Sequence, residues 1–527
     1  MRTVETVVFL VALATVVAAF ASRLRVPAPS LLVAVGVVVA LLPGAPLIHV
    51  PPEVVSLVVL PPLLYAASEE LAWRDLRAVW RPVAVLAVGL VAASAAAVAA
   101  VAGAVAPLSA SMAFVLGAVL ASTDPVAVSA LARRLSLPAR VQALVQAESL
   151  FNDATSLVLF QVAVSLAVGS TAGTAVTGVL LHGAGQFVTL AAGGVLAGVV
   201  VAMVAIVVRR RITDPVLETV AALITPYAAF LLGEAIHASG VTAVIVAGLV
   251  VGAWRPKITT ARTRLQVHAV YQTVIFVLES VVFSLIGLQL PTLTRAVGNT
   301  GLWLLPALAV SATLIVTRIA WVFPLWAAAH RRRGTGRPDW AVPAVVSWAG
   351  TRGVVPLAAA LSIPLTTASG AALPQRDLVV VVAAAAIVCS LLVQGSTLEP
   401  LARAAGLTRD RATAPGHEDT IARLQLAEAA LARLDELADD DAAPDAVIDQ
   451  VRDSLQARIG SSRASIARGP EPEPEKLTER QLRADLIAAE NAELARLSDE
   501  GTISSATRHR LQQSLDLELT RLTDPHR

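Results

Sequence analysis

The apolar stretch SASMAFVLGAVLASTDP (residues 109–125) decides the fold, because it reads as a membrane helix that runs into a polar triplet. Pro125 has no N–H group and its ring crowds the carbonyl of Ala121, so we expect the helix to break there. A broken helix is stable in a bilayer only where protein buries it or where it lines a polar cavity. The carbonyls that it frees suit small hard cations. The stretch therefore predicts a cation site near Thr123 and Asp124; the alternative is a purely structural kink.

Composition indicates a membrane protein with a soluble extension. The chain has 527 residues, of which 56% are apolar and 15% charged, whereas soluble domains are roughly 25% charged. Residues 1–408 contain 25 basic and 15 acidic side chains, and residues 409–527 contain 16 and 24. We predict a transmembrane domain over residues 1–408 and an acidic, helical, cytosolic C-terminal tail over residues 409–527. The single cysteine, Cys389, excludes an intrachain disulfide and a cysteine-rich metal site.

Thirteen segments of the first domain are apolar enough to cross a bilayer, which takes about 20 residues. They cover roughly residues 3–22, 30–49, 53–71, 82–104, 109–131, 140–168, 177–208, 215–236, 239–254, 268–290, 301–329, 340–365 and 376–404. Basic side chains gather in alternate loops, among them the loop with Arg74, Arg77 and Arg81. The positive-inside rule then places the N-terminus outside and the tail in the cytoplasm.

The layout of these spans predicts an internal repeat. If the seventh span is a connector, six spans precede it and six follow it. A second helix break falls at the equivalent place, because the ring of Pro356 would clash with the carbonyl of Arg352 in the twelfth span. Interrupted helices at matching positions are typical of transporters with a midplane binding site. The predicted fold is an all-α polytopic membrane protein with thirteen transmembrane helices, two inverted six-helix repeats, crossed broken helices (the fifth and twelfth) and a helical cytosolic tail.

The tail is predicted to form amphipathic helices joined by a linker. Alanine and leucine alternate with charged residues at helical spacing in residues 421–437, 477–497 and 507–522. The sequence GPEPEPE (residues 469–475) between the first two segments is a Pro/Glu linker. Two interpretations are open here: a solvated appendage, and a regulatory domain whose partner is unknown.

A second polar motif, ESLFND (residues 148–153), lies in the sixth span. Glu148 and Asn152 are four residues apart, as are Ser149 and Asp153, so these side chains share one side of the helix. Charged groups at bilayer depth are costly and each needs a reason. Two carboxylates, a hydroxyl and an amide beside the broken helix can form a monovalent-cation site. An aspartate that binds either a proton or a cation can exchange one for the other; the alternative is a structural polar cluster.

Other ionisable residues within the spans need separate explanations. Arg318 is a lone buried cation, for which Glu148 is a candidate partner; the alternative is a side chain that snorkels to the inner interface. Glu234 and Glu279 are expected near the outer vestibule or at helix packing contacts. Four carboxylates lie near span ends, where solvent accounts for them: Glu69, Glu70, Glu218 and Glu399.

Together these motifs resemble the monovalent cation/proton antiporter family of the NhaP and animal sodium/proton exchanger type. The matching segments occur in the family's order and cover residues 1–408, whereas the tail has no match. They are PPLLY (61–65), TDP (123–125), ESLFND (148–153), Glu234 with HASG (237–240), LIGL (285–288), GTRG (350–353) and QG (394–395).

The resemblance implies a dimerisation domain and a mobile core domain that work as a homodimer with an elevator-like movement. It implies that Asp153 carries both the ion and the proton. Thr123, Asp124 and Ser149 would complete the site for sodium or another monovalent cation, and Asn152 would orient it. Members with an Asn-Asp pair in this motif are electroneutral, so the resemblance implies exchange of one cation for one proton.

The resemblance also implies structural roles for three buried charges. Glu148 and Arg318 would form an ion pair, and Arg352 would compensate the facing ends of the crossed helices. One residue departs from the family pattern, because many relatives carry an acidic residue where this chain has Ala66. A gating or ion-coordinating contact of those relatives is therefore expected to be absent here.

The predicted function is secondary active antiport of sodium and protons across the plasma membrane, in pH homeostasis. No enzymatic activity, no nucleic-acid partner and no cofactor beyond the transported ions are expected, and the surrounding partner is membrane lipid. The alternatives are a potassium/proton antiporter, a passive cation channel and a membrane sensor. A channel would need a continuous polar stripe or repeated filter loops, and a sensor a recognisable output module. The sequence instead has one localised cluster and no phosphate-binding Gly-rich loop for ATP-driven transport.

Overall fold

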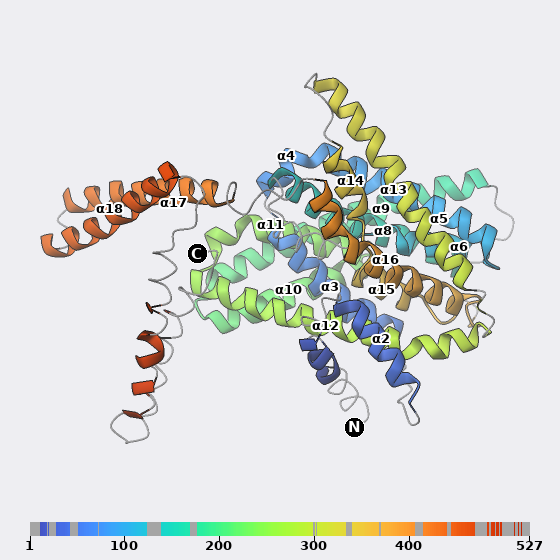
Figure 1. Cartoon of the computed structure of the whole chain (residues 1–527). Helices are drawn as coiled ribbons and strands as arrows, with labels where there is room; N and C mark the ends of the chain where they lie inside the picture. The colour runs from blue at the N-terminus through green and yellow to red at the C-terminus, as the bar shows by residue number, and fades with distance from the viewer. Residues whose placement is uncertain are drawn as a thin grey trace. The chain divides into compact units, whose positions relative to one another are not determined.

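The computed structural model divides the chain into two compact units, residues 1–408 and 409–527 (Figure 1). It describes residues 11–17, 19–20, 28–42, 51–71, 73–123, 139–168, 176–298, 301, 303–333, 340–367, 370–405, 415–439 and 444–468, with scattered residues from 482 to 518. Asp124 and Pro125 therefore lie outside the described residues, as does the Pro/Glu linker. Within these ranges the regular structure is helical, apart from one isolated bridge between Thr366 and Ala372.

The first unit is a bundle of helices, several of them much longer than a bilayer crossing requires. In chain order they are α2 (Ala28–Ala40), α3 (Pro52–Glu70), α4 (Trp73–Ala84), the π-helix η1 (Val85–Leu90), α5 (Val91–Val105), α6 (Ala110–Leu120), α8 (Ala139–Val168), α9 (Val176–Arg211), α10 (Pro215–Ala235), α11 (Gly240–Ile258), α12 (Ala261–Ala296), α13 (Leu304–Arg333), α14 (Ala341–Trp348), α15 (Val354–Leu361) and α16 (Arg376–Ala404).

Seven helical segments of the described chain are long and apolar enough to cross a membrane. They are Leu76–Val105, Ala143–Val168, Gly183–Arg211, Pro215–Ala235, Thr263–Ala296, Leu304–Ala328 and Arg376–Ala404. Shorter apolar helices accompany them at Leu31–Ala40, Ala110–Leu120 and Gly240–Arg255. For the described part of the chain, the prediction of a helical fold with several helices suited to span a membrane is therefore confirmed.

Capping residues determine where several helices begin. The side chain of Asp214 accepts hydrogen bonds from the backbone N–H groups of Val216 and Leu217 at the start of α10, where Pro215 occupies the first helical position. Ser239 and Thr260 cap α11 and α12 in the same way. These side chains satisfy backbone donors that have no partner inside the helix.

The helices of the first unit pack in two groups, as their contacts show. The flanking group consists of α2, α3 and α9–α12, and the site group of α4, η1, α5, α6, α8 and α13–α16. Glycines allow close packing inside the flanking group, because a Cβ atom on Gly36 of α2 would lie 2.9 Å from the Cα atom of Gly287 in α12. Such small residues are typical of tight helix contacts in membranes. The two groups touch where α12 meets α15 and α16, where α3 meets α15, and where α9 and α11 meet α8.

Two helices of the site group are interrupted. α6 ends at Leu120, and the chain is no longer helical at Ser122 and Thr123. α14 ends at Trp348 and α15 starts at Val354, so residues 349–353 separate two short helices. Pro356 lies in the first turn of α15. Backbone N–H groups in the first turn have no acceptor within the helix, so a proline there costs no helical hydrogen bond. The break that the sequence predicts around Arg352 is thus present.

The second unit contains two helices, α17 (Pro415–Asp439) and α18 (Asp445–Arg468), which pack against each other. Ile448, Leu455 and Ile459 lie buried along α18. Ion pairs join the two helices, including Arg463 with Glu428 at 2.7 Å.

Candidate ion-binding site

Four polar side chains of the ESLFND motif lie buried on α8. Glu148 and Asn152 are each 1% exposed, Ser149 is 2% exposed and Asp153 is 4% exposed. The helical period predicted that Glu148 and Asn152 share a face, and the amide nitrogen Nδ2 of Asn152 donates to Oε1 of Glu148 at 2.7 Å. Buried polar groups are costly unless they are paired, so this cluster constrains the helix that carries it.

The end of α6 closes over this face of α8. The hydroxyl of Ser149 donates to the backbone carbonyl of Thr123, and Nδ2 of Asn152 donates to Oγ1 of Thr123 at 3.2 Å. One turn further along α8, Ser156 Oγ donates to the carbonyl of Ala118 at 2.7 Å. Thr123 is itself 3% exposed. Thr123 is therefore in direct contact with Ser149 and Asn152, the latter adjacent in sequence to Asp153, whereas Asp124 lies outside the described residues.

Arg318 and Glu148 form a buried ion pair between α13 and α8. Nη1 and Nη2 of Arg318 donate to Oε1 and Oε2 of Glu148, each at 2.8 Å. Nε of Arg318 donates to the backbone carbonyl of Val346 in α14 at 3.2 Å. The guanidinium is 2% exposed, so its side chain does not reach the surface. Such two-pronged pairs fix orientation as well as charge.

Gly350 allows Arg318 to reach Glu148 past the interrupted helix. A Cβ atom at residue 350 would lie 2.6 Å from Cδ and 2.8 Å from Nε of Arg318. Cβ atoms do not approach neighbours this closely, so any larger residue would displace the arginine. The glycine of the GTRG segment is therefore required by a close approach.

Arg352 lies between the two interrupted helices and is 2% exposed. Its Nε donates to the carbonyl of Leu120, the last residue of α6, at 3.2 Å. Its Nη1 donates to the carbonyl of Gly350, just beyond α14. Both acceptors are carbonyls at helix C-terminal ends, which carry a partial negative charge. The guanidinium thus satisfies carbonyls that neither helix can pair internally.

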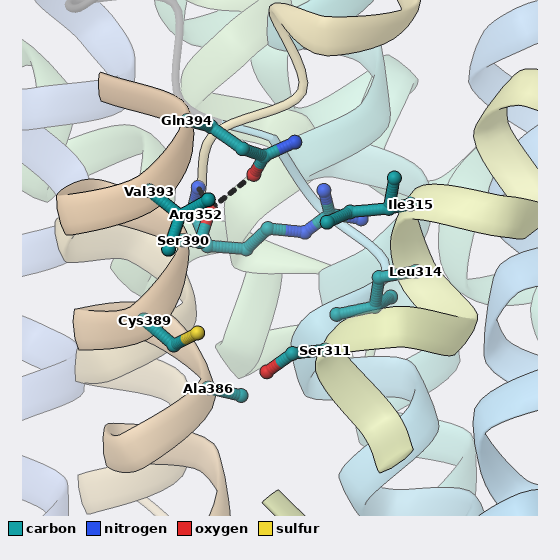
Figure 2. A pocket seen from close by; sticks show the side chains of 9 residues that line it. All are labelled: Ser311, Leu314, Ile315, Arg352, Ala386, Cys389, Ser390, Val393 and Gln394. Carbon is teal, nitrogen blue, oxygen red and sulfur yellow. Dashed lines mark hydrogen bonds between the residues drawn. The ribbon is translucent and has the colours of Figure 1, made fainter. Parts of the chain in front are cut away.

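A small cavity lies beside Arg352, between α13 and α16 (Figure 2). Its volume of about 40 Å³ is enough for a water molecule. Ser390 Oγ accepts from the backbone N–H of Arg352 at 3.1 Å and donates to Oε1 of Gln394 at 2.5 Å. The remaining lining residues are Ser311, Leu314, Ile315, Ala386, Cys389 and Val393.

A second buried ionic cluster lies in the flanking group, where no sequence pattern predicts it. Arg209 of α9 is 1% exposed, and Nη2 lies 3.3 Å from Oε1 of Glu218 in α10. Nη1 lies 3.6 Å from Oε1 of Glu69 in α3, and Nη2 donates to Oγ1 of Thr259 at 3.3 Å. The expectation that solvent accounts for Glu69 and Glu218 is wrong, because they are 7% and 3% exposed.

Glu234 lies at the end of α10 and contacts both helix groups. Its Oε1 accepts from the backbone N–H of Gly240 in α11 and from Nε2 of Gln161 in α8, each at 3.3 Å. Gln161 lies two turns beyond Asp153 on the same helix. Glu234 is therefore a helix packing contact, one of the two roles expected for it.

The site offers one set of oxygen ligands and few charges. Hydroxyl, amide and backbone oxygens meet at Thr123, Ser149 and Asn152, next along α8 to the buried Asp153, and Glu148 is already neutralised by Arg318. In the part of the chain that the structure describes, no group of three or more His, Cys, Asp or Glu side chains gathers. Neutral oxygens with one carboxylate suit a hard cation of low charge. Fold and site together define a polytopic membrane protein with a buried polar cluster at an interrupted helix.

The chain belongs to a family of membrane antiporters. Residues 9–404 match the family described as sodium/hydrogen exchanger, transmembrane. An uncharacterized Na(+)/H(+) exchanger of Mycobacterium tuberculosis is 36% identical, over 98% of this chain and 96% of its own length. A sodium, potassium, lithium and rubidium/H(+) antiporter of Bacillus pumilus is 30% identical, over 71% of this chain and 57% of its own length. The resemblance to monovalent cation/proton antiporters is therefore confirmed.

The fold has a counterpart among solved structures. The sodium proton antiporter MjNhaP1 from Methanocaldococcus jannaschii superposes with a TM-score of 0.60 at 19% sequence identity. The superposition covers 76% of this chain and 98% of that chain. The protein is thus a multi-pass membrane protein of the antiporter fold, and its relatives are transporters.

Proposed function

We propose that this protein exchanges one sodium ion for one proton across the plasma membrane by alternating access. The observation that carries the proposal is the burial of Asp153, a carboxyl group that is 4% exposed and follows Ser149 and Asn152 on α8, both of which bond to Thr123. A carboxylate in such surroundings binds either a proton or a cation, because each neutralises the same charge. Competition for one carboxylate couples the two flows.

The neighbours of Asp153 have separate roles in this proposal. Thr123, Ser149 and Asp124 supply the further oxygens for the cation. Asn152 orients the site, because its amide is held by Glu148 at 2.7 Å and by Thr123 at 3.2 Å. Asn152 does not titrate, so a single carboxyl group carries the exchanged charge and the cycle is electroneutral.

Three buried charges support the site without binding the ion. The pair of Glu148 and Arg318 is neutral and joins α8 to α13. Arg352 compensates the ends of α6 and α14. The protein needs no cofactor beyond the ions that it transports.

The membrane arrangement belongs to the same proposal. The chain crosses the plasma membrane thirteen times in two inverted repeats, with the N-terminus outside and the C-terminal tail in the cytoplasm. The basic residues of alternate loops support this orientation. The protein works as a homodimer in which the site group moves against the flanking group, consistent with the separate packing of the two groups.

A second candidate is potassium/proton antiport. The Bacillus pumilus relative is described as acting on sodium, potassium, lithium and rubidium, which favours a site that accepts cations of several sizes. Backbone and hydroxyl oxygens adapt to ion size more easily than a ring of carboxylates. A passive cation channel is the third candidate and would need no coupling to protons.

Purified protein in sealed vesicles distinguishes these candidates. An imposed pH gradient should drive sodium uptake, and an outward sodium gradient should drive proton uptake, each abolished by Asp153→Asn. Replacement of sodium by potassium or lithium ranks the cations. An imposed membrane potential should leave the exchange rate unchanged. Sodium flux that persists without a proton gradient and follows the potential would overturn coupled exchange in favour of a channel.

A further inference from the structure

The continuous helical segment formed by α4, η1 and α5 is longer than the hydrocarbon core of a bilayer is thick. The segment Leu76–Val105 has 30 residues, or about 45 Å at 1.5 Å per residue, whereas the hydrocarbon core is about 30 Å thick. Residues 84–105 contain no ionisable side chain, so the hydrocarbon core lies along that part. The excess length falls at the other end and places α4 at the level of the lipid headgroups.

One face of α4 is buried and the opposite face is exposed. Leu76 is 7% exposed, Val79 2% and Val83 3%, which fixes this face against the protein. Among the exposed side chains of α4, two tryptophans and three arginines occupy an arc of about 120° around the axis, at 100° per residue. They are Trp73, Arg74, Arg77, Trp80 and Arg81.

This exposed face combines three guanidinium groups with two indole rings. Trp73 and Trp80 are 55% and 56% exposed and stand two turns apart. The guanidinium of Arg81 lies 5.6 Å from the ring centre of Trp80. Tryptophan favours the boundary between headgroups and acyl chains, and arginine binds phosphate through two parallel N–H donors. With Asp75 included, the segment Trp73–Ala84 has a formal charge of +2.

We propose that the exposed face of α4 binds the headgroup of an anionic phospholipid. Arg74, Arg77 and Arg81 contact the phosphate and the anionic headgroup, and the two tryptophans lie along the upper acyl chains. Charge complementarity and the depth of α4 both select a lipid as the occupant. The opposite face of α4 packs against α8, the helix that carries Asp153, so the bound lipid holds that helix at a set depth.

The test uses the full chain in vesicles of phosphatidylcholine that contain a fixed fraction of brominated phosphatidylglycerol or brominated phosphatidylcholine. Bromine quenches tryptophan fluorescence on contact. We expect stronger quenching by the anionic lipid, and we expect Trp73→Phe/Trp80→Phe, which leaves six of the eight tryptophans, to abolish the difference. The triple variant Arg74→Gln/Arg77→Gln/Arg81→Gln should weaken the apparent affinity for phosphatidylglycerol on the order of 100-fold.

A matched control removes three exposed arginines of the tail, Arg433, Arg458 and Arg463, and should leave the preference unchanged. If the triple α4 variant fails to fold, Arg77→Gln alone should weaken binding roughly fivefold. Equal quenching by the two brominated lipids in the unmodified protein would overturn the proposal, and so would a preference that survives the triple variant. Neither outcome bears on sodium/proton exchange, which is measured separately.

Discussion

Around Glu148 one carboxylate faces one guanidinium, whereas around Arg209 one guanidinium faces two carboxylates. Both nitrogens of the Arg318 fork donate to Glu148 at 2.8 Å. Arg209 reaches Glu218 at 3.3 Å and Glu69 only at 3.6 Å. Oε1 of Glu69 accepts no hydrogen bond from the residues that the structure describes. In the first cluster both prongs of one guanidinium meet one carboxylate, whereas in the second Arg209 divides its contacts between two carboxylates.

This difference predicts how strongly protein stability depends on each charged residue of the two clusters. Removing one member of a matched buried pair leaves an uncompensated charge, which is strongly destabilising. In the second cluster the removal of Glu69 still leaves Arg209 with Glu218. We therefore expect the site group to depend on both members of its pair and the flanking group to tolerate the loss of one carboxylate.

The largest expected contrast concerns transport. Asp153→Asn removes the titrating carboxyl group at nearly constant volume and should abolish sodium-dependent proton movement in vesicles, with insertion unchanged. Glu69→Gln makes the same chemical change in the second cluster and should leave exchange measurable. The proposal that Asp153 carries the ions would fail if the Asp153 variant exchanged at a rate near that of the unmodified protein.

The next largest effect is expected on the free energy of unfolding when either member of the Glu148–Arg318 pair is replaced. Glu148→Gln and Arg318→Met should each cost about 3–5 kcal/mol of unfolding free energy, measured as thermal melting of the detergent-solubilised protein. The double variant should recover part of that loss, because no lone charge stays buried, with a coupling of about 0.5–3 kcal/mol. Losses that simply add would show that the two charges do not stabilise each other.

A third substitution changes the pair without altering any charge. Gly350→Ala places a methyl group only 2.6 Å from Cδ of Arg318 in the present geometry. Displacing the arginine should cost about 1–3 kcal/mol and reduce the coupling measured between Glu148 and Arg318. Gly185, whose added Cβ would meet nothing within 4 Å, provides the control substitution to alanine. Unchanged melting and coupling in the residue 350 variant would contradict the close contact.

The smallest effect is expected in the cluster around Arg209. Glu69→Gln should change the unfolding free energy by no more than about 1 kcal/mol, because Arg209 keeps Glu218 as its partner. Melting of this variant beside Glu148→Gln measures the contrast directly. A loss as large as that of Glu148→Gln would mean that Glu69 is an equal partner of Arg209 and that the comparison does not hold.

Helical periodicity and proline chemistry predict much of the fold and part of the site. Hydropathy indicates the apolar helices, and the clash of Pro356 with the carbonyl four residues earlier locates the break beside Arg352. The spacing of Glu148 and Asn152 places them on one face, where they form a hydrogen bond. The cost of a lone buried charge makes Glu148 a reasonable partner for Arg318, and the two are in contact.

Lateral packing could not be predicted from one chain. Arg209 belongs to a run of three arginines at the end of an apolar span, which reads as a solvated loop. Whether such a residue faces water or a neighbouring helix depends on which helices surround it, and hydropathy does not show which helices are neighbours. Helix ends have the same limitation: α12 begins at Ala261, seven residues before its apolar part, because Thr260 caps it there.

The contacts of Arg352 have a mechanical consequence. One guanidinium fastens the end of α6 to the loop after α14, while its backbone N–H is fixed to Ser390 of α16. These hydrogen bonds join the end of α6 and the loop between α14 and α15 into one block, so a displacement of either moves the other. In the proposed exchange cycle, the ion ligands can therefore stay together while this block turns from one side of the membrane to the other.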